Sequence, residues 1–214
     1  MVYVYDDIDD FNIVDFEKLY NKLSDERKEK VNKYKFMQDK KLSMISYLLL
    51  LAALKLEYNI KDDIIFKYNI YGKPYLKKYS NIYFNISHCK KGIICALSSN
   101  EIGVDIQDFI DFDDNILEYI MCNKEINRIS KSEKTKKDFI NLWTLKESYI
   151  KYLGIGLNYD LKSLNFSTFS QGTFKLYDCH FQLKEYKNYS FSICSHQIET
   201  IKFLSKAQLI NNLY

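Results

Sequence analysis

The chain has 214 residues, 47% of them hydrophobic, which is enough to bury the core of one large domain or two small ones. A formal net charge of +3 is too small to indicate a nucleic-acid-binding protein by itself. The five cysteines are odd in number and form no CxxC pair, which favours buried, reduced thiols and a cytoplasmic protein over a disulfide-rich secreted one.

The first elements expected along the chain are a strand and a long helical region. Residues 1–11 are acidic and lack the basic start and apolar run of a signal peptide. Residues 2–5 (VYVY) are expected to form a short strand, and residues 24–57 are expected to be helical, with a basic first part and a buried second part. Ser24 is followed three residues later by Arg27, so no capping box marks the helix start. The apolar run SYLLLLAALKL is about half as long as a bilayer-spanning helix, which predicts a buried helix and no membrane association.

A turn and three short strands are expected next. NIYGKPYL (residues 69–76) is predicted to be a turn between extended segments, because Gly72 and Pro74 interrupt it. Residues 81–107 have the pattern of three short strands. The middle strand, GIICALS (residues 92–98), is continuously apolar and is therefore expected to be buried on both faces.

The second half of the chain repeats this mixture of helices and strands. DDNILEYIMCN (residues 113–123) is expected to be helical, SKSEKTKKD (residues 130–138) to be a charged loop, and NLWTLKESYIKYL to be a helix that stops at Gly154. Strong alternation then predicts strands at residues 163–169, 172–178, 180–186, 189–196 and 200–205. GIICALSS and YSFSICSH are loosely alike, which hints at a duplicated unit. The expected fold is α+β, with mostly antiparallel sheets and a change near residues 105–110.

The strand EIGVDIQ (residues 101–107) contains a candidate metal site. Its apolar residues share one face, whereas Gly103, Asp105 and Gln107 point the other way. A carboxylate and an amide beside a glycine suit a hard cation such as magnesium. The alternative, which is the commoner case for a lone aspartate, is the solvent face of an amphipathic strand.

Several basic residues are candidates for phosphate binding. FNISH ends a strand with Ser87 and His88, and a histidine there suits phosphate binding or acid–base chemistry. Lys73 and the basic segment 27–33 also suit phosphates. The alternatives are a structural histidine and, in a lysine-rich chain, ordinary solvated lysines.

The helix NLWTLKESYIKYLGIGL has charges in unusual places. At about 100° per residue, Lys146 falls inside the apolar half of the helix, Glu147 lies at its edge, and Lys151 follows one turn after Glu147. An exposed Glu–Lys pair at this spacing contributes only a few tenths of a kcal/mol, so pairing alone is an ordinary explanation. Glu147 also suits a metal ligand or a base, and Lys151 suits neutralisation of a phosphate oxygen. Lys146 has no role that its position explains.

Taken in order, YGKP, FNISH, GVDI and WTLKESYIKYLGIGL resemble the motifs of the 4'-phosphopantetheinyl transferases of the two-domain type that activates peptide and polyketide synthetases. The resemblance is densest over residues 70–156 and extends back to ERKEKVNKYKF. It implies two similar α/β subdomains in a pseudo-twofold arrangement. Residues 1–104 are expected to bind the nucleotide of coenzyme A, and residues 105–214 to carry the metal and the catalytic helix.

The resemblance also implies roles for particular residues. Asp105 and Glu147 are expected to bind magnesium; Gln107, which replaces a second acid found in many family members, is the third candidate ligand and should weaken metal binding. The residues expected to bind the coenzyme A nucleotide and its phosphates are Arg27, Lys30, Tyr71, Gly72, Lys73, Asn85, Ser87, His88 and Lys151. The expected catalytic residues are Glu147 as the base, Lys151 on the departing phosphate, and His88 at the nucleotide.

The implied reaction is magnesium-dependent transfer of 4'-phosphopantetheine from coenzyme A to a serine of an apo acyl- or peptidyl-carrier protein, with release of 3',5'-ADP. A monomer is expected. The segment 113–125 is the candidate docking surface, with Ile120, Met121 and Cys122 as apolar contacts; a helix packed on its own domain is the alternative. Two rival functions are a non-catalytic protein that binds coenzyme A or a carrier protein, supported only by Gln107, and a nucleic-acid-binding module using residues 27–35, which the near-neutral charge disfavours.

Overall fold

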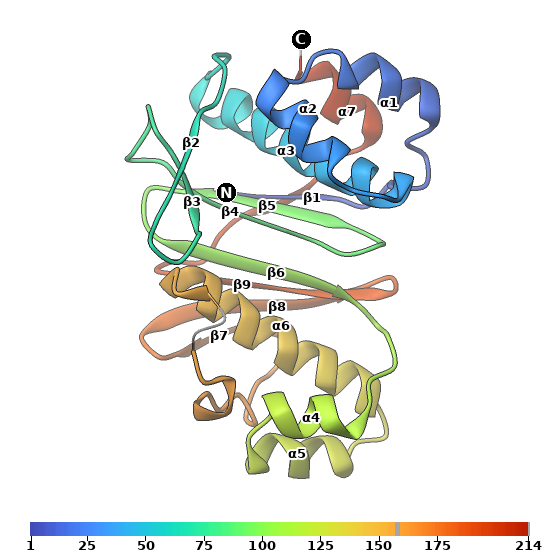
Figure 1. Cartoon of the computed structure of the whole chain (residues 1–214). Helices are drawn as coiled ribbons and strands as arrows, with labels where there is room; N and C mark the ends of the chain where they lie inside the picture. Colours follow the sequence, from blue (N-terminus) through green and yellow to red (C-terminus); the bar gives the residue numbers. More distant parts are fainter. Residues whose placement is uncertain (157–158, 214) are drawn as a thin grey trace.

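Two four-stranded sheets lie face to face at the centre of the molecule, and a long helix covers the outer face of each (Figure 1). The structure is a computed structural model that describes residues 1–156 and 159–213. The first sheet has the order β10-β1-β5-β4, with strands Ile201–Phe203, Val2–Tyr5, Ile93–Ser98 and Tyr83–His88. The second has the order β6-β9-β8-β7, with strands Ile102–Asp108, Tyr189–Ser195, Cys179–Tyr186 and Gly172–Leu176. Neighbouring strands are antiparallel, except that β10 runs parallel to β1.

The helices form the two outer layers (Figure 1). Over the first sheet lie α1 (Ile13–Tyr20), α2 (Asp25–Asn32), α3 (Met37–Tyr58) and α7 (Lys206–Asn211). Over the second lie α4 (Asp114–Ile120), α5 (Asn123–Ser130) and α6 (Thr135–Leu153). A small hairpin, β2 (Phe66–Tyr68) and β3 (Pro74–Leu76), stands beside the first sheet. The mixed α+β prediction with mostly antiparallel sheets is confirmed.

Strand β5 separates two apolar cores, as its continuous apolar sequence predicts. Alternate residues such as Ile93 and Cys95 join the core beneath α3, whereas Ile94 and Ala96 join the core between the two sheets. All of β5 is buried. A third core lies between the second sheet and α6.

The region 24–57 forms two helices rather than one continuous run. Ser24 caps α2 by accepting a hydrogen bond from the backbone N–H of Arg27, although no reciprocal acid follows. Helix α2 is charged around most of its circumference and buries only Val31, whereas α3 carries the apolar run that packs on the sheet. The burial predicted for SYLLLLAALKL is confirmed, and no helix within the described residues is long and apolar enough to cross a bilayer.

Residues 163–169 do not form the predicted strand. A short 3-10 helix, Leu161–Ser163, leads into a loop whose Leu164, Phe166 and Phe169 pack into the core beneath α6. The loop's backbone N–H groups donate to side chains or to carbonyls within the loop rather than to a neighbouring strand: the N–H of Phe166 donates to Glu125, and the N–H of Phe169 donates to the carbonyl of Phe166. The alternating pattern therefore reflects a buried loop. The other four predicted C-terminal strands are confirmed as β7 to β10.

The end of the chain returns to the first sheet. Strand β10 pairs with β1, and Leu204 and Leu209 pack in the core beneath α3. Residues 201–211 thus lie with the N-terminal elements. The division of the chain at residues 104 and 105 stays a prediction.

Candidate functional site

Asp105 lies on β6, on the face covered by α6, and is only 1% exposed. Its Oδ1 accepts hydrogen bonds from Ser87 Oγ at 2.8 Å and Lys151 Nζ at 2.5 Å, and its Oδ2 accepts one from Gln107 Nε2 at 3.3 Å. The alternative of a solvent-facing aspartate is therefore wrong. The predicted alternation of β6 is confirmed, because its apolar residues lie in the core between the sheets.

The meeting of two sheet edges brings the motifs FNISH and GVDI together. Strand β4 is the edge of the first sheet and β6 is the edge of the second. Asn85 Oδ1, on β4, accepts the backbone N–H of Val104 on β6 at 2.8 Å. Ser87, two residues further along β4, donates to Asp105, the next residue of β6. Asn85 and Ser87 are both buried and bonded within the protein. Their contacts with a nucleotide stay predictions.

Helix α6 places Glu147 and Lys151 against the same point of β6. The ammonium of Lys151 donates to Ser87 Oγ at 2.9 Å as well as to Asp105. Burial raises the pKa of Glu147, the negative charge of Asp105 raises it further, and Lys151 partly offsets both effects. The two carboxylates are therefore close enough to repel each other, and the ammonium of Lys151, which donates to Asp105, partly neutralises both.

This pair of carboxylates suits a hard divalent cation. A cation would relieve the repulsion between Asp105 and Glu147, and Mg²⁺ is commonly bound by one or two carboxylates together with water and substrate phosphates. Within residues 1–156 and 159–213, no cluster of three or more His, Cys, Asp or Glu has metal-binding geometry. Gln107 turns its amide nitrogen toward Asp105. Its role as a metal ligand stays a prediction.

Beside these carboxylates lies a pocket with basic and aromatic walls. Two adjoining cavities of about 300 and 220 Å³ share the side chains of Arg27, Lys30, Tyr47, Phe66 and Tyr68. The smaller cavity extends to Asn85 and His88 at the end of β4. The three aromatic residues are absent from the sequence predictions. Phe66 and Tyr68 are two residues apart on β2, so the sequence FKY indicates that they share one face of the strand. It does not indicate which face is covered.

Arg27 and Lys30 meet in this pocket, and their binding of a phosphate stays a prediction. The guanidinium of Arg27 donates from Nη2 to the carbonyl and hydroxyl oxygens of Ser43 and lies 5.0 Å from the ring centre of Tyr47. Its buried Nε has no hydrogen-bond partner within the described residues. Burial lowers the pKa of Arg27, while burial and then the charge of Arg27 lower the pKa of Lys30. A bound anion would offset both charges and give Nε a partner.

His88 connects the pocket to the carboxylates. It lines the smaller cavity, and although the residue is exposed, desolvation by neighbouring protein atoms, followed by the positive charge of Lys151, lowers its pKa from 6.5. The imidazole is therefore neutral at pH 7 and can donate one hydrogen bond. A bound phosphate would favour its protonated form.

The turn that contains Tyr71, Gly72 and Lys73 is held against the end of α6. Lys73 Nζ pairs with Glu101 at 2.5 Å and donates to the carbonyl of Tyr152 at 3.2 Å. None of the three turn residues lines the two cavities, although the adjacent Pro74 does. Their contacts with a nucleotide stay predictions.

Two of the three predicted apolar contacts in the docking segment 113–125 are buried within the protein. Ile120 and Met121 are 4% and 1% exposed, so the prediction that they are surface contacts is wrong. Both join the core beneath α6, because they lie where α4 ends and turns inward. The exposed apolar residues of α4 are Ile116 and Tyr119.

The environment of Glu147 predicts that this residue lowers stability. Because its pKa is raised in the folded state, the ionised carboxylate costs folding free energy above the raised pKa, and the cost disappears as pH falls to the ordinary value of 4.5. We therefore expect Glu147→Gln to raise Tm at pH 7 and to lose this advantage near pH 4. Thermal denaturation across this range, with Glu133→Gln as an exposed control, measures the effect. An equal or lower Tm at pH 7 would contradict it.

Two family models match the chain. A family model described as 4'-phosphopantetheinyl transferase superfamily matches residues 101–202, and one described as 4'-phosphopantetheinyl transferase, N-terminal, matches residues 12–101. A solved structure, the holo-[acyl-carrier-protein] synthase of Thermotoga maritima, aligns with a TM-score of 0.36 at 14% identity, over 45% of this chain and 64% of that one.

Curated relatives cover more of the chain. The 4'-phosphopantetheinyl transferase gsp of Aneurinibacillus migulanus is 34% identical over 69% of this chain and 63% of its own length. Sfp of Bacillus subtilis is 28% identical over 84% of both chains. The L-aminoadipate-semialdehyde dehydrogenase-phosphopantetheinyl transferase of Candida glabrata is 30% identical over 96% of this chain and 82% of its own. With that coverage, and with the motifs FNISH, GVDI and WTLKES meeting where β4, β6 and α6 adjoin, the chain belongs to the 4'-phosphopantetheinyl transferase superfamily.

Proposed function

We propose that this protein transfers the 4'-phosphopantetheine group of coenzyme A to a serine of an apo acyl- or peptidyl-carrier protein, with Mg²⁺, and releases 3',5'-ADP. One observation carries the proposal. The carboxylates of Asp105 and Glu147 adjoin a basic, aromatic pocket, and His88 borders both. The relatives are named as transferases of this group. We place the protein in the cytoplasm as a monomer.

The pocket supplies the proposed nucleotide site. Arg27 and Lys30 both line the cavities, and the buried Nε of Arg27, which has no hydrogen-bond partner within the described residues, suits the 3'-phosphate. The rings of Phe66 and Tyr68 suit an adenine base. His88 would hold the phosphates next to the carboxylates. Binding energy gained at the nucleotide, away from the reacting phosphorus, would orient the pyrophosphate at the carboxylates.

The reaction needs a nucleophile, a proton acceptor and charge neutralisation. The serine oxygen forms a bond to the β-phosphorus, the bond from that phosphorus to the bridging oxygen breaks, and 3',5'-ADP leaves. Glu147, whose raised pKa makes it a better base than an exposed glutamate, takes the serine proton. Lys151 stabilises the charge of the departing phosphate. Magnesium held by Asp105 and Glu147 would offset the negative charge of the pyrophosphate.

The non-catalytic alternative has weak support. It depends on the replacement of one family acid by Gln107. Two carboxylates and Lys151 nevertheless meet at the site. The test is to incubate the protein with coenzyme A, Mg²⁺ and several apo carrier proteins and to weigh the carriers by mass spectrometry. Gain of one phosphopantetheine supports transfer, and no gain on any carrier overturns it.

The basic end of the pocket gives a binding prediction. We expect Lys30→Met to weaken coenzyme A binding about tenfold but to change the binding of 3'-dephospho-coenzyme A by less than about twofold, because a lost charged contact is worth about 1.5 kcal/mol. Titration calorimetry measures both affinities. Lys28→Met is the matched control, since Lys28 is on the same helix, pairs with Asp25 and does not line the cavities. Equal weakening for both ligands would contradict the 3'-phosphate assignment.

A further inference from the structure

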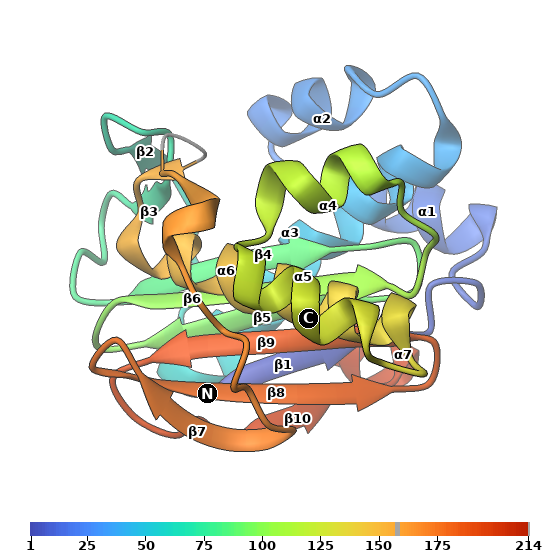
Figure 2. The same ribbon diagram turned by 90° about the horizontal axis from the view of Figure 1, so that it is seen from below.

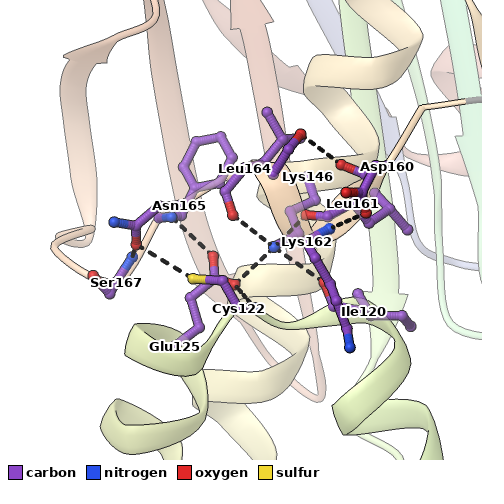
Figure 3. Close-up of polar contacts among 12 residues, drawn as sticks. Ile120, Cys122, Glu125, Lys146, Asp160, Leu161, Lys162, Leu164, Asn165 and Ser167 are labelled. Carbon is purple, nitrogen blue, oxygen red and sulfur yellow. Dashed lines mark hydrogen bonds and ion pairs between the residues drawn. The ribbon is translucent and has the colours of Figure 1, made fainter.

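Lys146 has no part in the proposed chemistry, yet its side chain is completely buried in the middle of α6. Figure 3 shows its ammonium at the centre of a set of oxygen atoms. It pairs with Glu125 at 2.7 Å, and it donates to the carbonyls of Leu161 at 2.7 Å, Leu164 at 2.9 Å and Ile120 at 3.1 Å. The apolar face of α6 can therefore contain a lysine, because polar groups from three other segments surround the ammonium of Lys146.

The carboxylate of Glu125 is fully engaged as well. It is 0% exposed, and besides Lys146 its Oε2 accepts the backbone N–H of Cys122 at 2.8 Å. Its Oε1 accepts the backbone N–H of Phe166 at 2.8 Å. The Lys146–Glu125 pair thus joins the end of α4, the start of α5 and the segment 161–166 to one turn of α6 (Figure 3).

Stability alone is a poor explanation for this pair. Removing two charges from water is costly, and an apolar pair of similar volume often stabilises a protein as well or better. Directional hydrogen bonds do something that apolar contacts do not, because they fix the relative positions of the segments that they join. The carbonyls of the 161–164 loop and of α4 have fixed distances to Lys146.

The turn of α6 that bears Lys146 also bears Glu147. Adjacent helical residues point about 100° apart, so Glu147 faces the carboxylate of Asp105 while Lys146 faces the α4–α5 layer. Figure 1 shows α6 between β6 and that layer. Figure 2 shows that α4 and α2, although they cover opposite faces of the sheets, both extend beyond the edge formed by β4 and β6. On α4, Tyr119 is 79% exposed and Ile116 is 40% exposed.

We propose that Lys146 and Glu125 are positioning residues that hold α4 at a fixed distance from Glu147, so that a carrier protein contacting Ile116 and Tyr119 presents its serine to that carboxylate. This inference rests on the proposed transferase function. The chemistry of the occupant follows from the reaction, because the serine of a carrier protein must reach the catalytic turn while the nucleotide occupies the pocket beside α2.

The decisive variant is Lys146→Met, which removes the ammonium and keeps the length of the side chain. We expect kcat/KM for the carrier protein to fall about 10- to 100-fold, because a displacement near 1 Å costs about that much. We expect coenzyme A affinity to stay within about twofold, because no residue of the network lines the pocket. Lys137→Met is the matched control on the same helix, where the lysine pairs with Glu185 near the surface.

A second variant separates positioning from folding. Lys146→Met/Glu125→Gln removes both charges and keeps one amide oxygen, which can accept the N–H of either Cys122 or Phe166 but not of both. We expect this protein to fold with a Tm somewhat below that of the wild type, because one buried N–H loses its acceptor, and to remain impaired in transfer. It is the test variant if Lys146→Met does not fold. Calorimetric titration with coenzyme A gives the fraction of active molecules, so a merely structural defect would lower that fraction and leave both KM values unchanged.

The outcomes separate the two proposals. A wild-type protein that modifies no carrier overturns the transferase function itself. A wild-type protein that is active, with a double variant that has wild-type kcat/KM for the carrier, overturns only the positioning role. The positioning role is also overturned if coenzyme A affinity falls in parallel with transfer. Loss for the carrier alone, in a folded protein, supports it.

Discussion

Glu147→Gln is expected to lower the rate of phosphopantetheine transfer about 1,000-fold or more. The substitution keeps the size of the side chain but removes a general base, which typically contributes about 10²–10⁴-fold. It also removes one of the two carboxylates at the proposed Mg²⁺ site. Transfer to a carrier protein, followed by mass spectrometry over time, measures the loss.

Two controls make the result specific to this carboxylate. Glu133→Gln changes an exposed glutamate before α6 and should leave transfer unchanged. The Tm of Glu147→Gln should not fall, because the raised pKa shows that the ionised side chain is unfavourable where it lies. A folded Glu147→Gln protein with more than about a tenth of the wild-type rate would remove Glu147 from the proposed mechanism.

Gly103→Ala is expected to abolish transfer by forcing α6 away from β6. A methyl group at Gly103 would overlap the carbonyl oxygen of Ser148 and the backbone nitrogen of Tyr152, which are main-chain atoms of α6 that cannot turn aside. The helix must therefore move, and Glu147 and Lys151 move with it. We expect destabilisation of about 3 kcal/mol or more, measured by urea denaturation, and loss of transfer in whatever protein remains folded.

Gly92→Ala is the matched control for this substitution. Its added methyl group would lie 2.9 Å from Cδ1 of Ile106, the far end of a side chain that can rotate. We expect a loss of about 1 kcal/mol and near-normal transfer. Equal stability of the two variants would show that the approach of α6 to β6 is not limited by the glycine.

Local sequence patterns predicted much of the architecture. The continuous apolar run of β5 and the two-residue alternation of β6 are confirmed, because burial on one or two faces of a strand leaves a direct pattern in the chain. Gly154 ends α6 with a φ of 68°, a conformation that glycine adopts at little cost. Helix α6 begins at Thr135, within the segment expected to be a charged loop, because its first turns are polar.

Other elements left no clear local pattern. The short helices α1 and α7 are absent from the sequence predictions, and their stability comes from packing beside α3 rather than from a long amphipathic repeat. The break between α2 and α3 falls within one stretch of helical composition. The loop at residues 163–169 alternates like a strand because three of its apolar side chains reach one core.

For the site, the sequence by itself determined the order and spacing of the candidate residues along the chain. It placed Asp105 opposite the apolar face of its strand and put Glu147 and Lys151 one turn apart, because both relations depend only on the periods of strand and helix. Only the tertiary structure decided that β4 and β6 adjoin at their edges, which buries Asp105 against Ser87 and Lys151. Only the tertiary structure showed that Glu125 is the partner of Lys146. Contacts between distant segments depend on how the elements pack, and such contacts leave no periodic pattern in the sequence.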